Sequence, residues 1–102
     1  MFIIYIWDKA IGKSIESLED FSGNEKFLIQ ADHNKYPLLS ELSNCDMELF
    51  SDEQLVELRQ EINRLLIEGE PLGENICTYL SSVISLVDRA YSDNQSVLFS
   101  PF

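Results

Sequence analysis

Two stretches in the second half of the chain carry apolar residues at intervals of three and four, the spacing that lines one face of an α-helix. Between Ser51 and Gly69 these are Leu55, Leu58, Ile62, Leu65 and Leu66. In residues 74–93 they are Ile76, Leu80, Val83, Val87, Ala90 and Tyr91. An apolar helix face has to be buried against another layer of structure. The sequence therefore predicts two long helices that pack on a shared core.

The boundaries of the first long helix carry their own signals. Ser51 and Gln54 match a capping box, in which the serine side chain accepts an amide of the first turn and the glutamine reaches back. Asp52 and Glu53 are expected in the first turn, where the helix dipole favours anions. Gly69 and Pro71 are expected to end the helix.

The remaining segments predict a small sheet. "FIIYIW", residues 2–7, is continuously apolar and predicts a central strand buried on both faces, followed by a turn at Gly12. "KFLIQA", residues 26–31, predicts a second strand. "VLFSPF", residues 97–102, predicts a last one, with Pro101 ending it or placing it at an edge.

Two shorter segments are expected to be helical. The threefold spacing of apolar residues in "SIESLEDF", residues 14–21, favours a short helix capped by Ser14, and "YPLLSELS", residues 36–43, favours a helical turn. The whole order predicts one α+β domain over residues 1–102. It consists of a small antiparallel or mixed sheet with two long helices packed on one face.

The charge of the chain is strongly unbalanced. Eighteen acidic residues against seven lysines and arginines give a formal net charge of −11. Such a chain repels nucleic acid and anionic membrane surfaces and attracts basic proteins. Because no signal peptide or apolar run of about 20 residues is visible, a cytoplasmic protein with no membrane contact is expected. An acidic domain that is merely soluble remains an alternative.

The acids concentrate around the first long helix. Glu53, Glu57 and Glu61 follow one another at intervals of four, on the side opposite the apolar face. Like charges at this spacing each cost a few tenths of a kcal/mol, so helix stability does not explain them. A basic protein partner does, and nearby aromatic residues would anchor it. The predicted partner-binding residues are Asp46, Glu48, Asp52, Glu53, Glu57, Glu61, Tyr36 and Phe50, with Trp7 as a further aromatic candidate.

Signatures of catalysis are missing from the sequence. The single histidine, His33, follows Asp32 in a predicted turn, where a solvated side chain is the expected role. No nucleophile elbow, zinc motif or phosphate-binding glycine loop is present, so the sequence predicts a non-enzyme without cofactor or metal. Cys45 and Cys77 are predicted to be free thiols, and a single disulfide stays open. The alternative function is a small-molecule binding or regulatory domain, with a pocket between sheet and helices.

One longer pattern carries a resemblance. In "YPLLSELSNCDMELFSDEQLVELRQEI", a Pro-Leu-Leu turn precedes an acidic patch that ends in phenylalanine, and a helix with Gln, Leu and Glu-Ile in register follows. These positions are Pro37, Leu38, Leu39, Asp46, Phe50, Gln54, Leu58, Glu61 and Ile62. In this pattern, and in its size and acidity, the chain resembles immunity proteins of bacterial toxin systems, including contact-dependent growth inhibition. The resemblance implies a cytoplasmic inhibitor that binds and neutralises a cognate basic toxin, in particular a nuclease.

Overall fold

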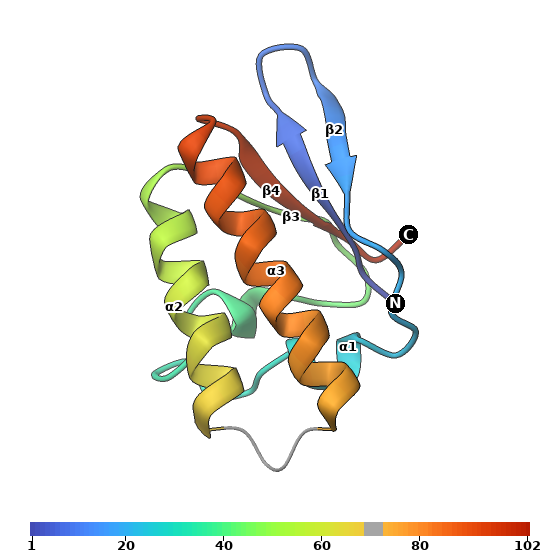
Figure 1. The fold of residues 1–102 in the computed structure, drawn as a ribbon, viewed down its shortest axis with the longest axis vertical. Coiled ribbons are helices and arrows are strands. Elements are labelled where there is room, and N and C mark those ends of the chain that lie inside the picture. The colour runs from blue at the N-terminus through green and yellow to red at the C-terminus, as the bar shows by residue number, and fades with distance from the viewer. Residues whose placement is uncertain (69–72) are drawn as a thin grey trace.

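The chain folds into a sheet backed on one face by two long helices, as the sequence predicts (Figure 1). The computed structural model describes residues 1–68 and 73–102. The elements in chain order are β1 (Ile3–Asp8), β2 (Lys13–Ser17), α1 (Glu25–Leu28), a 3₁₀ turn η1 (Leu39–Glu41), β3 (Glu48–Phe50), α2 (Glu53–Glu68), α3 (Glu74–Ser92) and β4 (Ser96–Ser100).

The four strands form a fully antiparallel sheet in the order β2-β1-β4-β3. The interior position predicted for residues 2–7 is confirmed, because β1 lies between β2 and β4. The prediction that this strand is buried on both faces is wrong. Ile4 and Ile6 are buried, whereas Ile3, Tyr5 and Trp7 are partly exposed, because α2 and α3 cover only one face of the sheet.

Two local predictions fail where tertiary structure overrides a weak pattern. Residues 13–17 form β2 and not a helix, because the chain reverses at Gly12, with φ 67°, and pairs back along β1. Residues 26–31 do not form a strand. Both edges of β1 are already occupied by β2 and β4, and Glu25–Leu28 instead forms the single helical turn α1.

The strand β3 was not predicted, whereas the last strand is confirmed, with Pro101 ending it as one of the two expected alternatives. β3 has only three residues, too few for an alternating pattern to be recognised. It takes the edge position, which places β4 in the interior. Pro101 follows the end of β4, so it ends the strand and does not mark an edge.

Both long helices are confirmed close to their predicted bounds. The expected stop at Gly69 and Pro71 lies outside the described residues. Only half of the capping box forms: the Ser51 amide donates to Gln54 Oε1 at 3.1 Å, while the Ser51 hydroxyl bonds to the Ser96 hydroxyl at 2.8 Å. Asp52 precedes α2 with a left-handed φ of 53°, so its predicted place in the first turn is wrong.

The core lies between the sheet and the helices. Phe99 is at its centre, with edge-to-face contacts to Phe2 at 6.1 Å and Phe50 at 5.6 Å between ring centroids. A buried polar residue, Asn24, joins the start of β1 to α3 through hydrogen bonds to Phe2 and Tyr79. None of the helices described here is long and apolar enough to cross a membrane.

The central position of β1 predicts slow amide exchange. Hydrogen bonds on both sides and the buried Ile4 and Ile6 side chains mean that residues 3–6 should open only by global unfolding. The edge strand β2, whose five residues are all exposed, should exchange through local opening. Hydrogen exchange followed by NMR checks this, and equally fast exchange in β1 and β2 would contradict the predicted order.

Candidate protein-binding surface

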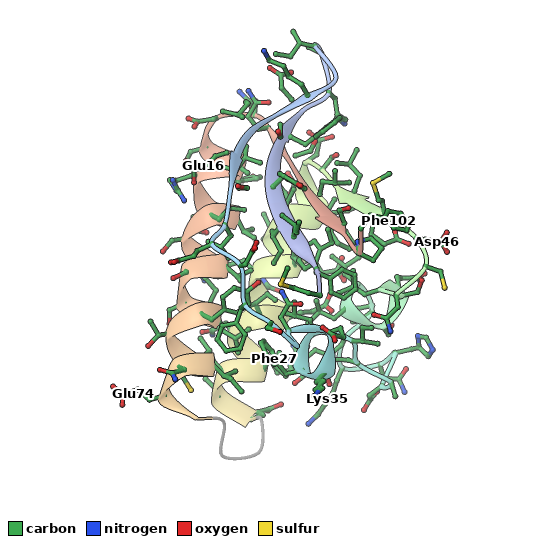
Figure 2. The ribbon with its side chains drawn as sticks, turned by 90° about the vertical axis from the view of Figure 1, so that its right-hand side faces the viewer. Glu16, Phe27, Lys35, Asp46, Glu74 and Phe102 are labelled. Carbon is green, nitrogen blue, oxygen red and sulfur yellow. The ribbon has the colours of Figure 1, made fainter. Side chains whose placement is uncertain are left out.

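The predicted acidic residues do not form one continuous ridge. Asp46 lies on the loop that leads into β3 (Figure 2), and Glu48 begins that strand. Asp52 and Glu53 stand at the other end of β3, where α2 begins. β3 at about 3.3 Å per residue separates Glu48 from Phe50 by roughly 7 Å, and Asp52 lies in the turn beyond it, with a left-handed φ of 53°. The structure therefore divides the predicted surface into two acidic groups.

The group before β3 is partly desolvated. Glu48 is half-buried, and burial raises the pKa of its carboxyl group. The neighbouring Glu41 and Asp46 carboxylates raise it further, because like charges disfavour ionisation. Glu41 and Asp46 therefore each lie close enough to Glu48 to repel its carboxylate.

Glu61 was predicted on the exposed acidic ridge, and this prediction is wrong. Its side chain is 1% exposed. Glu61 Oε1 accepts the amide of Leu38 at 3.0 Å and that of Leu39 at 2.9 Å, and Oε2 lies 3.0 Å from the Leu38 amide. These amides begin the 3₁₀ turn η1 and lack partners within it. Because the segment around η1 packs beside α2, the buried side of the helix is wider than its apolar face.

Two opposing effects act on the ionisation of Glu61. Burial raises the pKa of its carboxyl group, and the amides of Leu39 and Leu38 oppose this by favouring the anion. The net result is a pKa above the ordinary value of a glutamate. The buried Glu61 side chain thus links α2 to η1 through hydrogen bonds, and a partner protein has no access to it.

The two predicted aromatic anchors are also buried. Tyr36 is 6% exposed and Phe50 is 3% exposed. Phe50 faces the helices because β3 pairs it with Val97 of the core, and Tyr36 belongs to the same buried core. Trp7 is partly exposed, but it lies on the sheet face opposite the helices. The aromatic residues near the acids were therefore wrongly identified.

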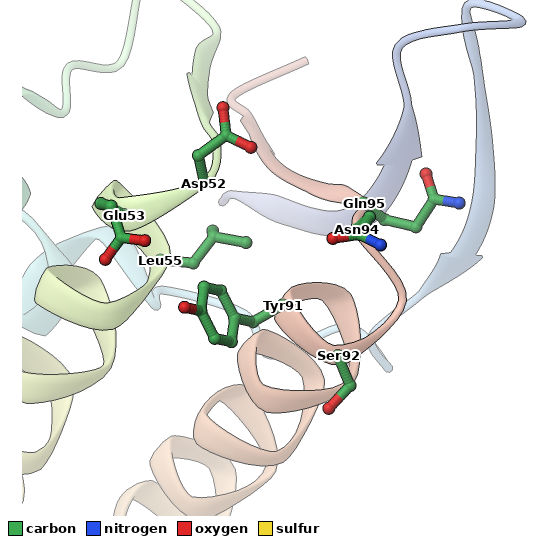
Figure 3. Close-up of a pocket in the computed structure, with 7 residues that line it drawn as sticks. All are labelled: Asp52, Glu53, Leu55, Tyr91, Ser92, Asn94 and Gln95. Carbon is green, nitrogen blue, oxygen red and sulfur yellow. The ribbon is translucent and has the colours of Figure 1, made fainter.

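An aromatic residue that the sequence assigned to the core takes their place. Tyr91 is in the last turn of α3 and is 44% exposed. Its ring points toward the beginning of α2, beside Glu53 (Figure 3). The helical spacing placed it on the apolar face. The sequence did offer one signal that Tyr91 is exposed. It lies in the final turn of α3, and the end of a helix can extend beyond the neighbouring helix.

Tyr91 and the second acidic group line one cavity of about 390 Å³. We call it the acidic cleft, and its lining residues are Asp52, Glu53, Leu55, Tyr91, Ser92, Asn94 and Gln95 (Figure 3). Asp52 and Asn94 both have left-handed backbones, with φ of 53° and 56°, which aspartate and asparagine adopt more readily than most residues. The cleft offers two carboxylates, one aromatic ring and two side-chain amides.

The basic residues of the chain do not neutralise this cleft. In the described part of the chain, ion pairs join Arg59 to Asp88 at 2.8 Å, Arg89 to Glu16 at 2.7 Å and Lys35 to Glu68 at 3.2 Å. A fourth joins the amino terminus to Glu25. Asp52, Glu53 and Glu57 belong to none of them, and all three are exposed. Their charge is available to a partner.

No family model matches this chain. No curated protein and no solved structure matches it either. The resemblance to immunity proteins therefore stays a prediction, and the function has to be argued from the geometry of the surface.

His33 and the adjacent Asp32 make separate contacts. His33 is exposed, and its Nδ1 lies 2.8 Å from the Ser40 hydroxyl. Asp32 Oδ1 accepts the amides of Asn34 and Lys35 at 2.9 and 3.1 Å, so this carboxylate stabilises the turn. Among the described residues, no group of three histidine, cysteine or acidic side chains is arranged to hold a metal ion.

The alternative function needs a pocket between the sheet and the helices. That space is filled by core side chains, including Ile4, Val83 and Phe99, each at most 1% exposed. A second cavity of about 420 Å³ lies instead beside the start of α3. Phe21 and Tyr79 contribute rings to it, and Glu19, Asp20 and Glu74 contribute carboxylates. It therefore also favours a cationic group.

Proposed function

We propose that this protein is a non-catalytic inhibitor that binds a basic protein partner through the acidic cleft. The partner that fits best is the cognate toxin domain of a bacterial toxin system, acting in the same cytoplasm. The observation that carries this proposal is the placement of two carboxylates without ion pairs, Asp52 and Glu53, beside the exposed ring of Tyr91.

The cleft suits the side chain of an arginine or a lysine. A guanidinium group can donate two hydrogen bonds to a carboxylate and stack on an aromatic face at the same time. Cation–π contact is worth about 0.5–1 kcal/mol at an exposed site and about 2 when the pair is desolvated by a partner. Tyr91 thus provides the anchor that charge alone lacks.

The net charge of the whole molecule supports the same role. A body with a charge of −11 attracts a basic surface from a distance and raises the association rate. An enzyme that binds a polyanion has a basic substrate cleft. A small acidic protein seated there excludes the substrate without any chemistry of its own.

A double substitution in the acidic cleft tests this proposal. Asp52→Asn with Glu53→Gln removes two charges, and asparagine tolerates the left-handed backbone at position 52. We expect the association rate with the toxin domain to fall about tenfold at low salt, with the difference shrinking above roughly 0.15 M salt. Tyr91→Ala should mainly raise the dissociation rate, by about tenfold. Stopped-flow or surface plasmon resonance measures both rates.

The matched control is Glu19→Gln with Asp20→Asn, which makes the same charge change at the second cavity. It should leave the rates within about twofold, because these groups lie outside the proposed contact. Equal effects of the two pairs would show that only the net charge matters and would reject the cleft. A basic toxin domain encoded beside the gene is the first partner to test. A gene neighbourhood of metabolic enzymes would favour the small-molecule alternative.

A further inference from the structure

The sheet has a second face that the helices do not use. Antiparallel partners lie on the same side of a sheet, so the buried Ile4 and Ile6 share the helix side with Phe99 and Val97. Glu16 of β2 is on that side too, where it pairs with Arg89 of α3 at 2.7 Å (Figure 2). The alternating residues must then face the opposite way.

We call this opposite side the outer face and define it by its apolar residues: Ile3, Tyr5, Trp7, Leu49 and Leu98. Leu49, Leu98 and Tyr5 form one row across three strands, because Leu49 pairs with Leu98 and Leu98 pairs with Tyr5. All five side chains are partly exposed. The other positions paired with them are serines, such as Ser17 and Ser96.

The outer face differs from the rest of the molecule in its charge. Among the paired strand positions that face this way, none is an aspartate, glutamate, lysine, arginine or histidine. The chain as a whole has a net charge of −11. Two copies of such a molecule repel each other in most orientations, since carboxylates would meet carboxylates. At the outer face two copies can approach without that repulsion at the contact.

We propose that the outer face binds the outer face of a second copy of this chain. Two sheets pack face to face about 10 Å apart, with their strands rotated by roughly 30°. The resulting dimer has four layers, with the helices on the outside and the acidic clefts free. Trp7 and Tyr5 are of the residue types that contribute most to the binding energy of interfaces.

The area of the outer face indicates how tightly the two copies should bind each other. Four strands about 4.8 Å apart and five residues of about 3.3 Å each cover roughly 300–400 Å² per copy. The total of about 600–800 Å² is below the ~1,200 Å² of stable interfaces, so the dimer belongs to the weak and reversible class. It should form over a range from about 10 µM to about 1 mM.

Sedimentation velocity across this concentration range tests whether the dimer forms. The effect of added salt on self-association then shows whether the contact surface is charged or uncharged. Because the contact is uncharged while the bodies repel, added salt should strengthen self-association, by about tenfold between roughly 0.02 M and 0.5 M. Trp7 is the only tryptophan of the chain, so its fluorescence should shift to shorter wavelength as the face becomes covered. A chain that stays monomeric throughout overturns the proposal.

A charged substitution within the face provides the matched comparison. Leu49→Glu places a carboxylate on the outer face at a side chain that is 38% exposed, on an edge strand, so the fold is retained. It should weaken self-association at least tenfold and remove the Trp7 shift. Ile67→Glu makes the same charge change on α2, at a side chain that is 73% exposed, and should change it by less than about twofold.

Two outcomes would assign self-association to another surface. Equal weakening by Leu49→Glu and Ile67→Glu would mean that only net charge matters, and the outer face would be rejected. Self-association that weakens with added salt would indicate contact between unlike charges, for instance Lys9 and Lys13 of the β1–β2 hairpin against carboxylates of a second copy. Either result overturns the proposal without affecting the acidic cleft, whose partner is tested separately.

Discussion

Replacing Glu61 by alanine should lower the free energy of unfolding by about 2–5 kcal/mol, because the amides of Leu38 and Leu39 lose their acceptor. An unsatisfied buried donor costs about 1–3 kcal/mol, and this substitution creates two of them beside a small cavity. Leu39 is fully buried, so water has poor access to its amide. For a domain of this size, each kcal/mol lowers Tm by about 4–8 °C. Thermal and urea unfolding followed by circular dichroism measure the loss.

Two further variants separate the hydrogen bonds from the charge. Glu61→Gln retains an oxygen that can take the place of Oε1, which accepts both amides, so it should cost less than about 1 kcal/mol. Glu57→Ala removes an exposed glutamate one turn earlier and should change stability by no more than about 0.5 kcal/mol. If Glu61→Ala costs no more than Glu57→Ala, the contact with η1 does not stabilise the fold.

The same comparison predicts a pH dependence. The pKa of Glu61 is raised in the folded protein, so its contribution to stability is complete below the unfolded pKa of about 4.3. That contribution is lost as the pH rises through the folded pKa. Relative to Glu61→Gln, the wild type should therefore become less stable from about pH 4 toward neutral pH. A difference of the opposite sign would mean that the two amides outweigh burial and that the pKa is lowered.

Replacing Asn24 by alanine should have a similar or larger effect, with a loss of about 3–5 kcal/mol. Asn24 Oδ1 accepts the Phe2 amide at 2.7 Å, and Nδ2 donates to the Phe2 carbonyl and to the Tyr79 hydroxyl, both at 2.9 Å. Asn24 is fully buried, so alanine leaves the polar groups of Phe2 and Tyr79 without these partners. Urea unfolding measures the loss.

The pKa of Tyr79 distinguishes the loss of the Asn24 hydrogen bonds from a general disruption of the fold. Burial raises the pKa of the Tyr79 hydroxyl, and the hydrogen bond from Asn24 opposes that rise. The substitution should therefore raise the pKa of Tyr79 further, which ultraviolet titration of the tyrosines detects. Asn75→Ala changes an exposed asparagine on the same helix as Tyr79 and should alter neither quantity. Equal losses from Asn24→Ala and Asn75→Ala would contradict the assigned role.

The parts of the fold that the sequence predicts are those with a long local pattern. Sixteen residues in α2 and nineteen in α3 give several turns of apolar spacing, and both helices were found. The short segments 14–21 and 26–31 carry three or four informative residues each. Their structure depends on which edges of β1 are free, and that is decided by segments far away in the chain.

The candidate surface was predicted in part for the same reason. Exposed charge on α2 follows from the helix period, so Glu53 and Glu57 were placed correctly. Glu61 differs from them only in facing η1, a neighbour that the helix pattern does not contain. Asn24 gave no signal because an asparagine in a turn is ordinary, and only its position between β1 and α3 makes it structural.

The pairing of β1 with β4 has a consequence for the folding of the chain during translation. The two central strands of the sheet lie roughly 90 residues apart in sequence, so their contact has a very high contact order. During translation, β1 emerges first and can pair only with β2 until β4 has left the ribosome. For that whole interval the apolar edge of β1 has no partner, which exposes it to pairing with other chains. We expect a nascent chain stalled before residue 96 to recruit chaperones that recognise extended apolar segments.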